Sequence, residues 1–74
     1  MPYSSTNDLP PGVRLHLPQH AQEIFLAAFN AAFAGHAGDP RQEEAANRIA
    51  WAAVKRSYEK LDDRWVAKPK RMSG

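Results

Sequence analysis

The sequence predicts a small, mainly all-α domain of three helices. Two long segments carry apolar residues every third or fourth position, which is the spacing of one helix face. Prolines and glycines fall between these segments, and the length of 74 residues suits a single domain. The chain has no cysteine, which excludes disulfides and thiolate metal sites. Hydrophobic residues make up 43% and charged residues 24%, as in a globular domain and unlike a disordered chain.

A short first helix is expected between Asn7 and Pro18. The side chain of Asn7 or Asp8 can cap it by accepting hydrogen bonds from free N–H groups. The prolines at positions 10 and 11 suit its first turn, where no N–H is needed. Pro18 ends it, because the residue before a proline is pushed out of the helical region. One face carries apolar residues at fourfold spacing: Leu9, Val13 and Leu17.

The second helix is expected to start at Pro18 and to end at the glycines of residues 35–38. Glycine takes the left-handed conformation of a helix C-cap without a steric penalty. Between these limits, apolar residues fall in steps of three and four: Ala21, Ile24, Phe25, Ala28, Phe29, Ala32 and Phe33.

The third helix is expected to begin at Asp39, a good N-cap residue. Pro40 suits the first helical position, and Gln42 can reach back as in a capping box. Glu43 and Glu44 add negative charge where the helix dipole is positive. The apolar stripe then runs through Ala46, Ile49, Ala50, Ala53, Val54, Ser57, Tyr58 and Leu61, with Trp51 at its edge. The pair Asp62-Asp63 is interpreted as a helix stop.

The segment after the third helix is expected to form a strand. Trp65 and Val66 have β propensity and are too few for a helix. The segment around Tyr3 is the only obvious partner, so we expect a minor two-stranded pairing of the N- and C-terminal segments. Residues 1–67 form the single domain in this interpretation, and residues 68–74 are a basic, frayed tail. Bulk in the core is expected from Phe25, Phe29, Phe33, Ile24, Ile49, Val54, Leu61 and the two tryptophans, with Trp65 folding back over Trp51.

No motif in the sequence is typical of an enzyme or of a cofactor site. His16 and His20 have a spacing that could hold zinc on one helix, but Pro18 lies between them and no third ligand is near. Asp62-Asp63 lacks the ligand pattern of a calcium loop. No Ser-His-Asp arrangement, phosphate-binding loop or dinucleotide fingerprint occurs. We therefore expect no catalytic residue, no metal, no cofactor and no small-molecule substrate.

The basic residues are the best candidates for contacts with a partner. The net charge is +2 and the pI about 9.3. Arg41, Arg48 and Lys55 recur every seven residues opposite the apolar stripe, which suits either a solvated face or an anionic partner. Glu59 is expected on the same line. Beyond Asp63 the chain has no acidic residue and carries four further candidates: Arg64, Lys68, Lys70 and Arg71. Trp65 could stack on a base, although a tryptophan more often closes a core.

Location and assembly follow from general features. No apolar run approaches the ~20 residues that cross a bilayer, and the first residues lack the pattern of a signal peptide. A cytoplasmic monomer is the expectation.

The order of motifs resembles the ChaB family. The matching segments are Met1-Pro2-Tyr3, Asp8-Leu9-Pro10, Leu17-Pro18-Gln19-His20-Ala21-Gln22, Ala28-Phe29-Asn30, Ala50-Trp51-Ala52-Ala53-Val54-Lys55, Tyr58 and Trp65. They are collinear and cover nearly the whole chain. The loop at 35–38 departs from the family, whose members often carry a longer, charged insert there.

The resemblance implies a small helical fold with a minor strand pairing. It also implies a cytoplasmic accessory role, in which the protein regulates a membrane cation antiporter, sodium or calcium/proton, by protein–protein binding. The alternative is a small nucleic-acid-binding module that uses the basic C-terminal segment, since ChaB-like domains also occur in proteins linked to nucleic acid. A third hypothesis is an adaptor for another protein.

Overall fold

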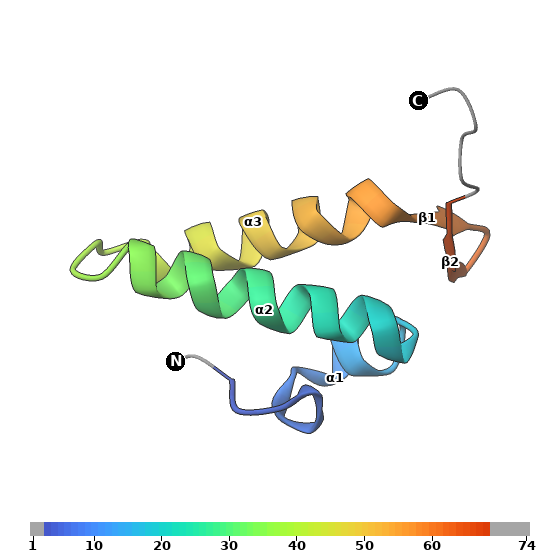
Figure 1. Ribbon diagram of the computed structural model, residues 1–74, viewed down its shortest axis with the longest axis horizontal. Helices are drawn as coiled ribbons and strands as arrows, with labels where there is room; N and C mark the ends of the chain where they lie inside the picture. Colours follow the sequence, from blue (N-terminus) through green and yellow to red (C-terminus); the bar gives the residue numbers. More distant parts are fainter. Residues whose placement is uncertain (1–2, 69–74) are drawn as a thin grey trace.

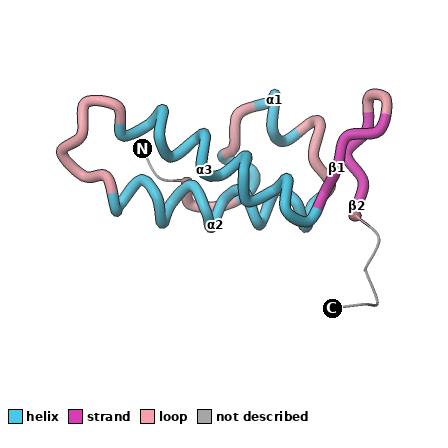
Figure 2. Tube along the Cα trace, turned by 90° about the horizontal axis from the view of Figure 1, so that it is seen from above, coloured by secondary structure: helices cyan, strands magenta, loops and turns pink. Residues whose placement is uncertain are grey.

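Two long antiparallel helices dominate the computed structural model, which describes residues 3–68 (Figure 1). A short N-terminal segment, residues 3–17, packs against the two helices. A β-hairpin follows the second helix. Figure 2 shows the connection between the helices at one end of the pair and the hairpin at the other. In chain order the elements are η1 (Thr6–Asp8), α1 (Pro11–Arg14), α2 (Gln19–Gly35), α3 (Gln42–Ser57), β1 (Tyr58–Leu61) and β2 (Arg64–Ala67).

The core lies where the N-terminal segment, α2 and α3 meet. Phe25 and Phe29 of α2 are each 1% exposed, and their rings stack with centroids 6.1 Å apart. Helix α3 packs on them with small side chains at spacing four, Ala46, Ala50 and Val54, each of which is fully buried. Small side chains let helix axes approach closely, so the bulk of the core comes mainly from the phenylalanine stripe of α2.

The N-terminal segment buries the expected apolar residues without forming the expected single helix. Leu9, Val13 and Leu17 are buried, but the chain makes a 3₁₀ turn and then one helical turn, α1. Pro10 separates these two elements in an extended conformation, with ψ at 150°, because Pro11 follows it. Neither Asn7 nor Asp8 caps α1, so the predicted cap is wrong.

The polar residue Gln22 fixes this segment to α2. It is 8% exposed, and its Nε2 donates hydrogen bonds to the carbonyls of Arg14 and Leu17, at 3.0 and 2.8 Å. These carbonyls lie at the C-terminal end of α1 and just beyond it, where backbone acceptors lack helical partners.

The loop between the long helices follows the sequence prediction in part. Gly38 has a φ of 86°, the left-handed region that favours glycine. Asp39 accepts a hydrogen bond from the backbone N–H of Arg41 at 2.8 Å, yet α3 starts only at Gln42. Gln42 does not complete a capping box, because its Nε2 donates to the Phe33 carbonyl at 2.6 Å. The side chain thus joins the two helix ends across the loop.

The third helix ends earlier than predicted. Tyr58 is extended, with φ at −131° and ψ at 153°, and it opens β1. Leu61, which the helical stripe placed in the core, is 52% exposed, and Ile49 is 41% exposed. Both residues were expected to add bulk to the core, and this expectation is wrong. The strand interrupts the helical periodicity at Ser57, and of residues 58–68 only Tyr58 is buried.

The two-stranded sheet exists, but its partners differ from the prediction. β1 pairs antiparallel with β2, in a register that joins Lys60 to Trp65 and Leu61 to Arg64. Asp62 turns the chain with a φ of 57°, a conformation that Asp tolerates. The predicted pairing of the two termini is therefore wrong.

The backbone of Tyr3 hydrogen-bonds to a side chain of α2 and not to a second strand. The backbone N–H of Tyr3 donates to Asn30 Oδ1 at 2.9 Å, and Asn30 Nδ2 donates to the Tyr3 carbonyl at 2.8 Å. A single Asn of α2 thereby satisfies both backbone groups that a strand would have used.

Trp65 folds back over the end of the core, as predicted. Its ring lies 5.6 Å from that of Trp51, which in turn meets Phe25 edge-on at 5.3 Å. The backbone N–H of Lys68 donates to the carbonyl of Ser57 at 2.8 Å, so this residue belongs with the hairpin. The rest of the predicted tail, residues 69–74, lies outside the described residues.

Candidate partner-binding surface

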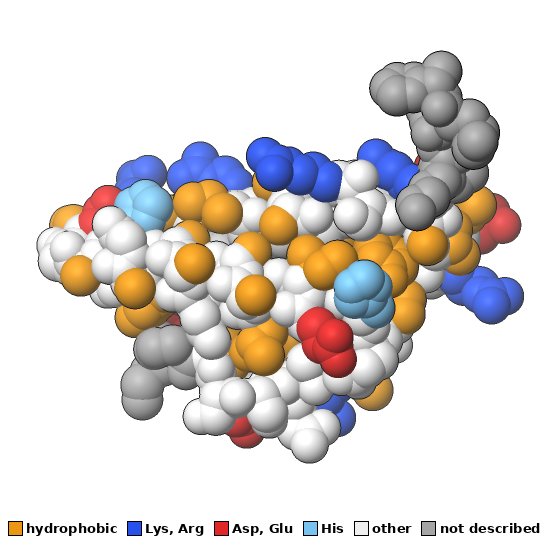
Figure 3. All heavy atoms as spheres, in the orientation of Figure 1, with side chains coloured by type: hydrophobic (Ala, Val, Ile, Leu, Met, Phe, Trp, Pro, Cys, Tyr) orange, Lys and Arg blue, Asp and Glu red, His pale blue; other side chains and the backbone are white. Residues whose placement is uncertain are grey.

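A row of basic side chains runs along the outer face of α3. Arg48 and Lys55 are exposed residues of α3, and their sevenfold spacing keeps them within ~20° of one line on the helix. Arg41 is exposed at the N-cap position, directly before the helix begins. Arg56 is exposed beside them. We call these four residues the basic row, and Figure 3 shows Lys and Arg side chains lined up along α3.

Glu59 does not interrupt the row as the sequence suggested, although Glu43 and Glu44 lie between Arg41 and Arg48 in the first turn of α3. Glu59, expected on the same line, lies in strand β1 and off the helix. Between Glu44 and the end of α3, every charged residue is basic. Lys55 and Arg56 fall in the last turn of the helix, where cations also complement the helix dipole. Arg56 was missed at the sequence level, although the acid-free stretch after Glu44 was a visible signal.

The C-terminal candidates divide between two places. Lys68 lies at the C-terminal end of α3, because its backbone is hydrogen-bonded to Ser57. Arg64 lies at the turn of the hairpin, opposite Leu61, and so at the other end of β2. Lys70 and Arg71 lie outside the described residues. The structure therefore brings Lys68 to the end of the basic row and leaves Arg64 apart from it.

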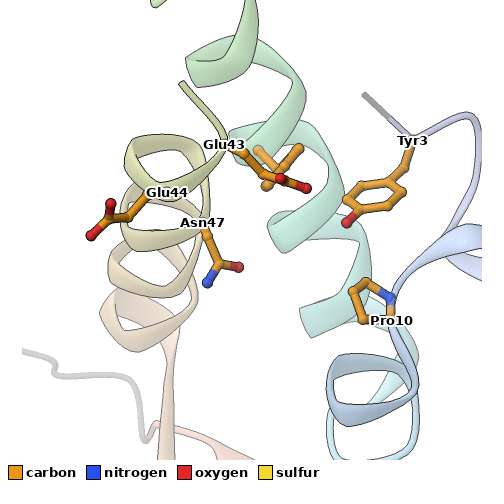
Figure 4. A pocket seen from close by; sticks show the side chains of 6 residues that line it. Tyr3, Pro10, Glu43, Glu44 and Asn47 are labelled. Atoms are coloured by element: carbon orange, nitrogen blue, oxygen red, sulfur yellow. The ribbon is translucent and has the colours of Figure 1, made fainter. Parts of the chain in front are cut away.

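A pocket of about 350 Å³ lies on the side of α3 that faces the N-terminal segment. Its lining residues are Tyr3, Pro10, Phe29, Glu43, Glu44 and Asn47. Figure 4 shows the side chain of Glu43 pointing towards Tyr3, whose ring lies 4.9 Å from that of Phe29. At the sequence level the two glutamates were interpreted only as charges of the first helical turn, and nothing there indicated that Tyr3 would face them.

The surroundings of Tyr3 raise its pKa from the usual 10.0, chiefly through burial and further through the negative charge of Glu43. Both causes disfavour the phenolate. A group whose folded-state pKa is raised adds stability below its unfolded pKa, and this stability is lost as pH rises through the folded-state pKa. We expect unfolding to become easier above about pH 10.

The variant Glu43→Gln should lower the pKa of Tyr3 towards its usual value, without reaching it because burial remains. The pH titration of the Tyr3 ring signals by NMR measures this. Glu44→Gln is the matched control, since Glu44 lines the same pocket without being a cause of the shift. An equal change from both variants would contradict the specific pairing of Tyr3 with Glu43.

The three histidines have separate structural contacts. His16 Nδ1 lies 2.8 Å from the Gly12 carbonyl, and His36 Nδ1 lies 2.9 Å from the Ala32 carbonyl. The ring of His20 meets Tyr58 edge-on at 6.2 Å. Among residues 3–68, no group of three His, Cys, Asp or Glu side chains could hold a metal ion. Within the same residues, no helix has the length and apolar character needed to cross a bilayer.

Helical packing, a closing hairpin and a basic outer face define a small helical domain with exposed cations along α3. The family model named ChaB matches residues 9–68, and the chain belongs to the ChaB family. Relatives from Escherichia coli strain K12 and from Shigella flexneri are each 44% identical over 75 residues, covering 92% of this chain and 99% of theirs. Both carry the name "Putative cation transport regulator ChaB".

A solved relative has the same fold. The structure described as "NMR solution structure of the putative cation transport regulator ChaB" superposes with a TM-score of 0.82 and 44% sequence identity. The match covers 92% of this chain and 100% of that one. The expected small helical fold with a minor strand pairing is thus confirmed at the level of the family.

Proposed function

We propose that this chain is a non-enzymatic regulator that binds a cation antiporter from the cytoplasmic side. Family membership supports a role in cation transport, because the relatives are named for it. The observation that carries the binding mode is the basic row on α3, whose stretch from Arg48 to Arg56 contains exposed cations and no acidic residue. A rigid array of one charge favours encounter with a surface of the opposite charge.

The partner surface is therefore an acidic cytoplasmic face of the transporter, a sodium or calcium/proton antiporter. Charges at the rim of an interface chiefly increase the association rate and give salt dependence. Lys68, at the end of α3, extends the row. Arg64 lies at the hairpin turn, apart from the row, and is a separate candidate for contact with the partner.

Reversing two charges of the row tests this proposal. The double variant Arg48→Glu/Lys55→Glu should bind the antiporter about tenfold more weakly than the wild type, as expected for exposed charges at an interface. Co-purification with the antiporter and ion flux in antiporter-containing vesicles, with and without the protein, measure binding and regulation.

The matched control is Arg14→Glu/Lys60→Glu, which changes the net charge equally at exposed positions away from the row. If the control loses as much binding as the test variant, net charge and not the row governs association. Absence of co-purification together with unchanged ion flux would remove the proposal altogether.

The second candidate is a nucleic-acid-binding module, favoured by the same basic row. Contacts would be chiefly to phosphates, because the Trp65 ring is partly buried and packs against Trp51. Each phosphate contact on duplex DNA adds about −0.9 to the slope of log affinity against log salt. A gel-shift assay at low salt that shows no retarded species would exclude this candidate.

A further inference from the structure

The N-terminal segment covers only one side of the α2–α3 pair. On α2, Gln22 and Asn30 face this segment, since both donate hydrogen bonds to its carbonyls. On α3, Glu43 and Asn47 face it, because they line a pocket together with Tyr3. The opposite flank of each helix therefore points away from the N-terminal segment.

That opposite side carries a line of apolar residues from both helices. Ile24, Ala28 and Ala31 of α2 follow each other at spacings of four and three, and Ile49 and Ala53 of α3 at a spacing of four. We call these five residues the apolar strip. Figure 3 shows hydrophobic side chains along the boundary of the two helices, bordered on one side by the Lys and Arg side chains of α3.

The composition of the strip is unusual for a helix face that meets water. From Ile24 to Gly35, α2 has no side chain of Asp, Glu, Lys or Arg, whereas an outer helix face is normally polar. Ile49 is 41% exposed, although a Gln or Lys there would cost the core little. Ile24 and Ala28 are partly buried against the core, whereas Ala31 and Ile49 are exposed, so the outer part of the strip is left uncovered by residues 3–68.

We propose that the apolar strip binds an amphipathic α-helix with acidic residues along one flank. Both sides of the strip are helices of 17 and 16 residues, so the strip is long and narrow, and a third helix lying along it would complete a bundle. Alanines allow close approach of the axes, and Ile24 and Ile49 provide the larger contacts. Arg48, Lys55 and Arg56 border the strip and select acidic residues on the neighbouring flank of that helix.

Charge and side-chain size favour this occupant over two others. A second copy of the chain would bring its own basic row against this one, and like charges repel. A lipid surface calls for large apolar side chains that reach the acyl region, whereas the strip is made chiefly of alanine. The identity of the protein that carries the helix rests on the proposed function, but the chemistry of the helix does not.

The test uses a fluorescent amphipathic peptide of about 18 residues, or roughly five helical turns. Leu and Ala form its apolar face, Glu lines one flank and Gln fills the rest. Its twin carries Lys in place of Glu. In fluorescence anisotropy at low salt, the Glu peptide should bind the full chain at least tenfold more tightly than the Lys peptide, and added salt should reduce the difference.

Three variants of the protein test whether the peptide lies on the strip. Ile49→Gln should weaken binding at least fivefold, whereas Leu15→Gln should leave it unchanged, because Leu15 is a 72% exposed apolar residue outside the strip. Ala31→Glu, at an exposed position, should weaken binding through repulsion of the Glu flank. Circular dichroism verifies that each variant is folded.

Several results would overturn the proposal. These are equal affinity for the two peptides, binding that Ile49→Gln and Ala31→Glu leave intact, self-association that Ile49→Gln abolishes, and binding to phosphatidylglycerol vesicles that depends on Ile49. The proposed function fails separately. If the protein binds the antiporter but not the peptide, only the apolar-strip proposal is excluded. If it binds the peptide but not the antiporter, only the proposed function is excluded.

Discussion

Replacing Phe29 with Ala should cost about 3–5 kcal/mol of unfolding free energy. Phe29 is 1% exposed and its ring meets three other aromatic rings, those of Tyr3 at 4.9 Å, Phe33 at 5.8 Å and Phe25 at 6.1 Å. A stability of about 0.05–0.15 kcal/mol per residue gives a chain of this size only about 4–11 kcal/mol in total. The variant should therefore be partly unfolded in buffer, as urea titrations followed by circular dichroism measure.

Phe33→Ala is the matched control one helical turn further along. Its ring stacks on Phe29 but is only partly buried, so its loss should cost less than half as much. The milder variant Phe29→Leu keeps the core apolar and should remain folded, which gives a measurable midpoint. If Phe33→Ala lowers the free energy of unfolding more than Phe29→Ala does, the centre of the core lies nearer the α2–α3 loop.

The long helices were predictable because their apolar residues repeat over several turns. A periodic stripe of this length indicates a helix, and the prolines and glycines near its ends mark where that helix begins and ends. The N-terminal segment is different, because Leu9, Val13 and Leu17 have helical spacing while Pro10 and Pro11 impose an extended residue between two turns. The sequence pattern predicted the burial of these residues correctly and their secondary structure only in part.

The end of α3 could not be predicted from periodicity. Tyr58 and Leu61 continue the helical spacing, but their strand pairs with residues that follow in the chain. Residues 58–61 could continue the helix or form a strand, and packing against distant residues decides between the two. The strand allows the chain to turn at Asp62 and brings Trp65 to Trp51. Such a contact, fourteen residues apart in sequence, is invisible to a local pattern.

Three residues of the basic row were predictable, and Arg56 was missed. Arg41, Arg48 and Lys55 depend only on helix geometry, which the sequence specifies well. The apolar strip was not found, because Ile49 and Ala53 were assigned to the core along with the rest of the stripe. The flank of the helix pair that stays uncovered is set by where the N-terminal segment packs. That position depends on the hydrogen bonds that Gln22 and Asn30 donate to carbonyls of the segment.

Replacing Trp65 with Ala should lower the free energy of unfolding by more than about 2 kcal/mol. This is less than the loss expected for a fully buried aromatic side chain. Trp65 is partly buried against the core and covers Trp51, which itself packs edge-on against Phe25. Its removal exposes Trp51 to water and loosens the hairpin that carries Lys68 back to α3. Urea titrations should show a lower midpoint, and the fluorescence of Trp51, then the sole tryptophan, should shift to longer wavelength.

Leu61→Ala is the control within the same hairpin. Leu61 is 52% exposed and does not face the core, so its loss should change stability by no more than about 0.5 kcal/mol. Both residues lie in the two-stranded sheet, and the comparison therefore separates packing on Trp51 from strand propensity. If Leu61→Ala costs as much as Trp65→Ala, the sheet itself stabilises the domain. If Trp65→Ala costs nothing, Trp65 is not a core residue, and its ring is free for a binding partner.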